Sequence, residues 1–238
     1  MRRLAPALAL LLTAGCTADS TGDTASEVAA AVEVRTVRDD STGAELPRVT
    51  IAGRPEVEAR VNASLDSLSA SLACDPDISR PGPDPFEYDT VARVDHAADD
   101  VLSVNIHSSY NCGGPYPSAG VNQSVTYDLT TGEAVPFDAL FRDDADRSAL
   151  GGLLSAALTP MAGDMDGDCD EVLSADALSG GSFGYSLNDE GIAVQPDFPH
   201  VIAACGVEAT LPYASVRAFA RDGGVLARVA DAAAGAVR

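Results

Sequence analysis

The sequence predicts a single α+β domain in which an antiparallel sheet is packed by two main helices and held by two disulfides. Segments with strand character come in runs between separated helical segments, which favours hairpins over repeated βαβ units. Two segments carry their apolar residues on one helical face. Besides Cys16 the chain has four cysteines, an even number that suits two disulfides.

The first residues have the pattern of a bacterial lipoprotein signal. Residues 1–15 begin with two arginines after the initial methionine and continue into the apolar stretch Ala7–Leu12, which is too short to span a bilayer. Small residues precede Cys16, as in a lipobox, although Thr13 replaces the usual larger aliphatic residue. We therefore expect Cys16 to be acylated, with an ordinary secretory signal as the alternative. Residues 16–29 would then be a flexible polar tether.

From this signal we expect the protein in the cell envelope, lipid-anchored to a bacterial membrane on its periplasmic or extracellular face. The signal leaves the leaflet open.

The net charge of the chain limits which partners are expected. The chain has 15 basic and 36 acidic residues and a formal net charge of −21. Such a surface repels phosphate backbones, so nucleic acid is not expected as a partner. It would attract a cation or a basic protein, or it only keeps an exported protein soluble.

In the first half of the chain, Val32–Arg38 and Glu45–Ala52 are expected to be strands. Pro55–Ala73 is the clearest helix, because Pro55 suits a first helical turn. Its apolar residues recur at helical spacing: Val57, Val61, Leu65, Leu68 and Leu72.

A run of strands follows this helix. Phe86–His96 and Val101–Tyr110 are expected to form a hairpin, since apolar and polar residues alternate in the second of them. Gly120–Leu129 is a further strand, and Thr130–Glu133 is the turn that ends it.

The second half begins with a predicted helix over Asp146–Leu158, which carries leucines on one face. Shorter elements are expected after it: a helical piece over Glu171–Leu178, a hairpin of Phe183–Leu187 and Ile192–Gln195, a strand over Glu208–Tyr213 and a helical Ala214–Ala220. We place the domain over residues 30–222 and treat 223–238 as an alanine-rich C-terminal tail, with a helix there as the open alternative.

The four remaining cysteines allow three pairings. We favour Cys74–Cys112 and Cys169–Cys205, because each bridge then stays within a local supersecondary unit. No CxxC spacing occurs and the histidines are scattered, so a zinc site is not predicted.

Gly180–Gly184 fits the G-x-S-x-G pattern of a serine hydrolase, and Asp197 and His200 follow Ser182 in hydrolase order. The nucleophile elbow, however, needs a strand before the serine and a helix after it, whereas a glycine-rich loop precedes Ser182 and a strand-like segment follows it. A hydrolase that uses Ser182 is therefore the less favoured alternative, and we predict no catalytic residue and no cofactor.

An acidic stretch with the carboxylates Asp164, Asp166 and Asp168 resembles a calcium-binding loop. An EF-hand loop needs glycine at its sixth position and glutamate at its twelfth. Counted from Asp164, this stretch has Gly167 fourth and Ala175 twelfth. We predict no metal site, and a nonstandard calcium site stays open.

The histidines give no further candidate. His96, His107 and His200 are each isolated in the sequence and are expected to be surface residues.

The order of several short motifs resembles one known family. The motifs are the early amphipathic helix, the double glycine after a strand, a Y-D-L-x-T-G turn, a D-x-L-F connector and a late hairpin: Val57–Leu72, Tyr110–Gly114, Val125–Glu133, Phe137–Phe141, Phe183–Gln195 and Leu211–Tyr213. They resemble the RsiV-like domain of unknown function, found in ectodomains of lysozyme-sensing anti-sigma factors and in the N-terminal part of some peptidoglycan deacetylases.

The resemblance implies a noncatalytic envelope module that binds a partner protein or a cell-wall component. Lysozyme or another basic hydrolase is the narrower candidate. The family usually follows its double glycine with alanine and histidine, where this chain has Pro115 and Tyr116. The role of that histidine is therefore not carried over, and Tyr116 is the residue of this loop expected to contact a partner.

Overall fold

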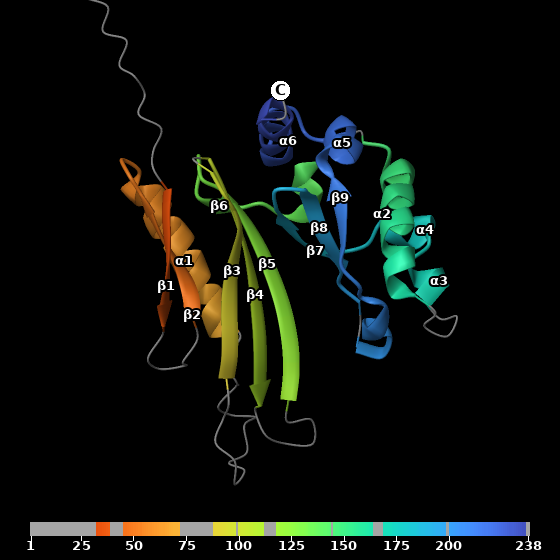
Figure 1. Ribbon diagram of the computed structural model, residues 1–238, viewed down its shortest axis with the longest axis horizontal. Coiled ribbons are helices and arrows are strands. Elements are labelled where there is room, and N and C mark those ends of the chain that lie inside the picture. Colours follow the sequence, from red (N-terminus) through yellow and green to blue (C-terminus); the bar gives the residue numbers. More distant parts are fainter. Residues whose placement is uncertain are drawn as a thin grey trace, which may run out of the picture.

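The computed structural model describes residues 32–38, 45–71, 88–98, 100–111, 118–143, 145–163, 169–198 and 200–236. Within these ranges the predicted α+β class is confirmed. Two sheets lie side by side, each with its own helices (Figure 1).

The first sheet has six strands in the order β1-β2-β3-β4-β5-β6. Neighbouring strands are antiparallel except β2 and β3, which pair in parallel where Glu45 meets Val91. The strands are β1 (Val32–Arg38), β2 (Glu45–Ile51), β3 (Tyr88–Ala97), β4 (Val101–Asn111), β5 (Ser118–Asp128) and β6 (Glu133–Ala134).

The second sheet is antiparallel, with β8 (Gly191–Pro196) between β7 (Phe183–Leu187) and β9 (Ala209–Pro212). The sequence predicted one antiparallel sheet without βαβ units, and both expectations are wrong. Helix α1 (Pro55–Ser71) connects the parallel strands β2 and β3. Because a long Pro/Asp-rich segment follows α1, the sequence did not indicate that the strands before and after this helix are parallel neighbours.

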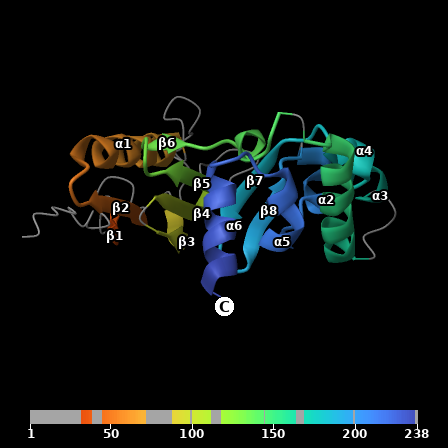
Figure 2. The ribbon, with the colours of Figure 1, turned by 90° about the horizontal axis from the view of Figure 1, so that it is seen from above.

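The prediction of two main helices is also wrong. Besides α1 and α2 (Arg147–Ala162), the residues expected to form a C-terminal tail contain a third long helix, α6 (Val225–Ala236). Figure 2 shows α6 between the two ends of the molecule at which α1 and α2 lie. The shorter helices are α3 (Cys169–Val172), α4 (Ala175–Leu178), α5 (Tyr213–Val216) and the 3-10 turns η1 (Phe137–Leu140), η2 (His200–Cys205) and η3 (Arg217–Phe219).

Helix α6 belongs to the domain because its apolar face is buried. Val225, Leu226 and Val229 are each at most 5% exposed and join the same core as α2 and the second sheet. An alanine-rich segment is a good helix former, and these larger side chains provide the burial that fixes it in place.

The described residues form two hydrophobic cores, one beside each sheet. The first packs α1 against one face of the larger sheet, with Val61 and Leu65 against Leu102, Val104 and Ile106. The second fills the space between β7–β9, α2, η1 and α6. In that core Phe137 contacts the rings of Phe141, Phe183 and Tyr185.

Helix α1 also completes the hydrogen bonding of β2, which separates from β3 beyond Glu45. The side-chain amide of Asn62 donates to the carbonyl oxygen of Val49 over 2.9 Å and accepts from the Val49 N–H over 3.0 Å. The N–H of Ile51 donates to the carboxylate of Glu58 over 2.9 Å. Buried backbone groups left without such partners would cost free energy.

Replacing Asn62 with alanine should therefore lower the free energy of unfolding by about 1–3 kcal/mol, because both polar groups of Val49 lose their partner. Chemical denaturation would measure the loss. Ser67→Ala on the same helix is the matched control, since the Ser67 hydroxyl is exposed and bonds to the carbonyl of Ala63 within the helix. Equal effects of the two substitutions would show that Asn62 does not complete the strand edge.

Candidate functional site

The Y-D-L-x-T-G motif forms a turn that ends β5. The Asp128 carboxylate accepts hydrogen bonds from the N–H and the hydroxyl of Thr130, at 2.9 and 2.6 Å. The Asp128 carbonyl accepts from the N–H groups of Thr131 and Gly132. Gly132 has a φ of 76°, and a β-carbon there would lie 3.1 Å from the carbonyl oxygen of Val57. The turn therefore requires glycine and packs closely on α1.

The residues around this turn also contact α1 and Arg54, the residue before it. Arg54 donates to the carbonyl oxygen of Leu129 over 2.9 Å, and the Tyr127 hydroxyl donates to that of Ser64 over 3.0 Å. The Tyr127 ring is fully buried. The Y-D-L-x-T-G motif thus joins the sheet to α1.

An ion-pair cluster joins the same turn to α6. Arg228 of α6 donates through Nε to Asp100 over 2.5 Å, and its Nη2 lies 3.0 Å from Asp128 Oδ1. Within the described residues Nη2 has no aligned hydrogen-bond acceptor, so its contact with Asp128 is an ion pair only. Burial acts to raise the pKa of Asp128, but the Thr130 hydrogen bonds and Arg228 outweigh it, and the pKa lies below its usual value.

A bulge in β3 contains two more ionisable residues, Asp95 and His96. The register shifts between Val94 and His96, and Asp95 is the extra residue. The Asp95 side chain is 4% exposed; Oδ1 accepts from Arg93 Nε over 2.5 Å, while Oδ2 has no hydrogen-bond partner among the described residues. β-Bulges often change the direction in which a side chain points.

His96 lies opposite Ser103 and is half-buried. Burial lowers the pKa of its imidazole, and the charges of Asp189 and Asp100 oppose that effect only in part. The neutral imidazole is therefore favoured in the folded protein.

This shift predicts a dependence of stability on pH. In the unfolded chain the histidine is protonated below its ordinary pKa of about 6.5, whereas in the fold protonation requires a lower pH. Stability should therefore fall as the pH is lowered from about 7.5 through 6.5, until the folded pKa is reached. His96→Gln should flatten this decline, and His107→Gln is the matched control. An unchanged pH profile in the His96 variant would contradict the assignment. Urea unfolding midpoints at several pH values would measure it.

Two buried hydroxyls join the sheets near this point. Ser103 Oγ and Thr126 Oγ1 are 2.9 Å apart, and the N–H of Leu187 in β7 donates to Ser103 Oγ over 2.9 Å. Both hydroxyl residues are fully buried. The polar face of β4 and β5 is thus used here to attach the second sheet.

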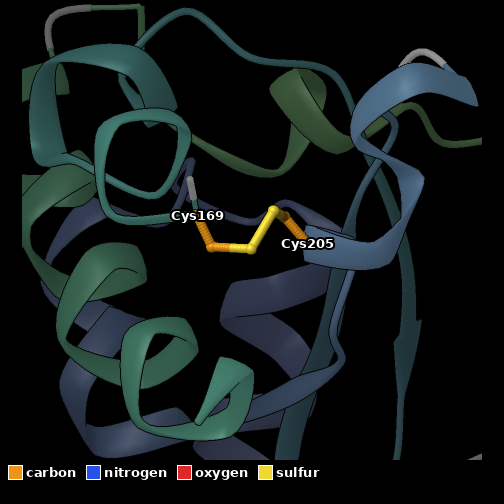
Figure 3. Close-up of a disulfide and its surroundings, with 2 residues drawn as sticks. All are labelled: Cys169 and Cys205. Atoms are coloured by element: carbon orange, nitrogen blue, oxygen red, sulfur yellow. A yellow bond between two sulfur atoms is a disulfide. The ribbon is translucent and has the colours of Figure 1, made fainter. Parts of the chain in front are cut away.

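The predicted Cys169–Cys205 disulfide is confirmed (Figure 3). It joins α3 to η2, with 5.4 Å between the α-carbons, and both residues are buried in the second core. Within the described residues it is the one disulfide present, where two were predicted for the whole chain.

Several predicted site residues lie outside the described residues. They are Cys16 and the tether, the Cys74–Cys112 pair, Tyr116, and the carboxylates Asp164, Asp166 and Asp168. Their roles stay predictions. Elsewhere in the described ranges, no three metal-ligating side chains come together. No helix described here is long and apolar enough to cross a bilayer.

The structure places Ser182 on an exposed loop between α4 and β7. A nucleophile elbow has a strand before the serine and a helix after it, and here the order is reversed. The carbonyl of Ser182 accepts from the N–H of Asp197, which continues the β7–β8 hairpin. His200 begins η2, beyond that hairpin.

The chain has no match among protein-family models or among curated proteins. A crystal structure of a DUF3298-family member from Bacteroides fragilis is similar, with a TM-score of 0.51 at 12% identity over 84% of this chain and 97% of that chain. A second DUF3298-family structure, from Pseudomonas aeruginosa, has a TM-score of 0.47 at 12% identity over 81% of this chain and 94% of that chain.

At these identities the likeness concerns the fold alone. It does not test the RsiV-like resemblance or the lipoprotein signal, which stay predictions. The chain therefore has a fold like that of the Bacteroides fragilis member of DUF3298, a family named as a domain of unknown function.

Proposed function

We propose that the protein is a noncatalytic cell-envelope lipoprotein whose α+β domain binds a partner protein or a cell-wall component. The observation that carries the proposal is the position of Ser182, the centre of the one sequence pattern that indicated catalysis. It lies on an exposed loop that leads from a helix into a strand. The lipobox at Cys16 and the RsiV-like resemblance support the envelope setting.

The residues of the Y-D-L-x-T-G turn are engaged within the fold. Asp128 accepts hydrogen bonds from Thr130, Gly132 packs on α1, and Arg228 compensates the Asp128 charge. Groups used in this way stabilise the fold and are not free to act on a substrate.

A capture experiment tests this proposal. The chain lacking residues 1–16 is coupled to a resin and exposed to envelope extract and to purified peptidoglycan. We expect retention of a specific protein or of peptidoglycan, with no chemical change in the bound material. Turnover of the bound material that is lost in a Ser182→Ala variant would establish the hydrolase alternative instead.

Lysozyme or another basic hydrolase is the second candidate partner, and the net charge of −21 favours it. Opposite charges accelerate the encounter of two proteins. If the chain inhibits such an enzyme, lysis of a cell-wall suspension by lysozyme should slow as the chain is added in stoichiometric amounts. Undiminished lysis with lysozyme bound would identify a binder without inhibition, and undiminished lysis without binding would exclude this partner.

A further inference from the structure

The outer edge of β1 has the features of a self-pairing surface. β1 is the last strand on its side of the six-stranded sheet, and its pairing with β2 is regular over all seven residues, without a bulge. Figure 1 shows no described strand beyond it. Exposed strand edges are usually blocked by proline, a bulge or a covering element, and the described residues provide none of these at the β1 edge.

Charged side chains are the remaining protection, and in β1 they are arranged in a particular way. Glu33 and Arg35 are exposed, point to the same side of the strand, and form no ion pair with another described residue. Val37 is 39% exposed, which is high for a valine. Opposite charges two positions apart repel a copy of the strand in some registers and attract it in others.

Two-fold symmetry limits the registers in which two antiparallel copies of β1 can meet. Opposite residues in an antiparallel pair point to the same side, so in a symmetric pair one residue lies opposite its own copy, and the two-fold axis passes midway between them. Centred on Arg35, the pairing would oppose two arginines, which is unfavourable. Centred on Thr36, it would oppose Arg35 to Val37 and provide no charge pair.

The register centred on Val34 is different. It places Val34 opposite Val34 and sets Glu33 of each copy opposite Arg35 of the other, so two complementary pairs flank an apolar centre. Cross-strand pairs of both kinds stabilise antiparallel sheets. We propose that a second copy of this chain pairs with β1 in this register and extends the six-stranded sheet across a two-fold axis.

This contact would be small and therefore weak. A five-residue strand pair buries less surface than stable interfaces do, and each copy carries a formal net charge of −21. Self-association should therefore appear at high protein concentration. It does not depend on the proposed function.

A cysteine scan of the full chain tests the register. Val34→Cys, Arg35→Cys and Thr36→Cys variants are oxidised at high concentration, and intermolecular disulfides are quantified against the unchanged chain. We expect the Val34 variant to cross-link about tenfold faster than the other two, because only there do the two β-carbons face each other. Equal rates at the three positions would overturn the proposal.

Charge reversal tests the pairing independently. In sedimentation experiments Glu33→Arg and Arg35→Glu should each weaken self-association, and an equal mixture of the two variants should restore it, because every cross-strand pair is then complementary. Arg38→Glu controls for net charge: it changes the charge as Arg35→Glu does and lies beyond the five paired residues, although it also removes the exposed Arg38–Glu45 ion pair within the chain. A chain that is monomeric at every concentration, or a mixture that does not recover, would overturn the proposal.

Discussion

Replacing Gly151 with alanine is expected to lower the free energy of unfolding by about 3 kcal/mol, because no room exists for a β-carbon where α2 meets α4. The added atom would overlap the main-chain oxygen of Ala175 and lie 3.2 Å from the β-carbon of Ser179. Backbone cannot move aside as cheaply as a flexible side chain. The two helices would have to separate.

Gly152 provides the matched control one residue further along α2. A β-carbon there has no heavy atom within 4 Å. Since alanine is the better helix former, Gly152→Ala should raise stability by up to about 1 kcal/mol. Urea unfolding of both variants would measure the difference. Destabilisation of similar size in the two variants would contradict the close approach of α2 and α4 at Gly151.

Loss of the Cys169–Cys205 disulfide is expected to have an effect of similar size. The two cysteines are 36 residues apart in sequence, and a bridge over that distance restricts the unfolded chain by about 4 kcal/mol in the loop-entropy description. The double replacement Cys169→Ala and Cys205→Ala should therefore lower the free energy of unfolding by roughly that amount, measured by urea unfolding. A loss below about 1 kcal/mol would contradict the entropic estimate.

The same double variant also tests the second predicted disulfide, Cys74–Cys112. Once Cys169 and Cys205 are replaced, a reductant should destabilise the protein further only if Cys74 and Cys112 are bonded to each other. Comparing unfolding curves with and without reductant gives this result. No further change on reduction would contradict the predicted Cys74–Cys112 pairing.

Features that depend on neighbouring residues could be predicted from the sequence. The apolar spacing that indicated a helix over Pro55–Ala73 corresponds to α1 at Pro55–Ser71, and the alternation in Val101–Tyr110 corresponds to β4. The late hairpin and the turn at 130–133 were predicted for the same reason. Local periodicity and turn chemistry determine these elements.

Features that depend on distant partners could not be predicted. Whether α6 is a tail or part of the core is decided by the second sheet and α2, which its own alanine-rich sequence does not reveal. The parallel pairing of β2 and β3 is similar, since it depends on where the chain returns after α1.

The polar clusters were missed for the same physical reason. Arg228 contacts Asp100 from a position 128 residues later in the chain, and no spacing rule connects them. His96 looked like an isolated surface histidine because Asp189, whose charge acts on it, lies in the β7–β8 turn of the second sheet. The Asp128 turn could be recognised as a motif, but its packing against α1 and α6 required the fold.

The most direct test of noncatalytic binding to a basic partner is a calorimetric titration of the chain lacking residues 1–16 with lysozyme at low and at high salt. We predict saturable binding at low salt that weakens as salt is added, because screening reduces the attraction between the two charged surfaces. Absence of binding at low salt, or binding that salt does not change, would contradict charge-driven binding of lysozyme and leave only the cell-wall or another protein partner.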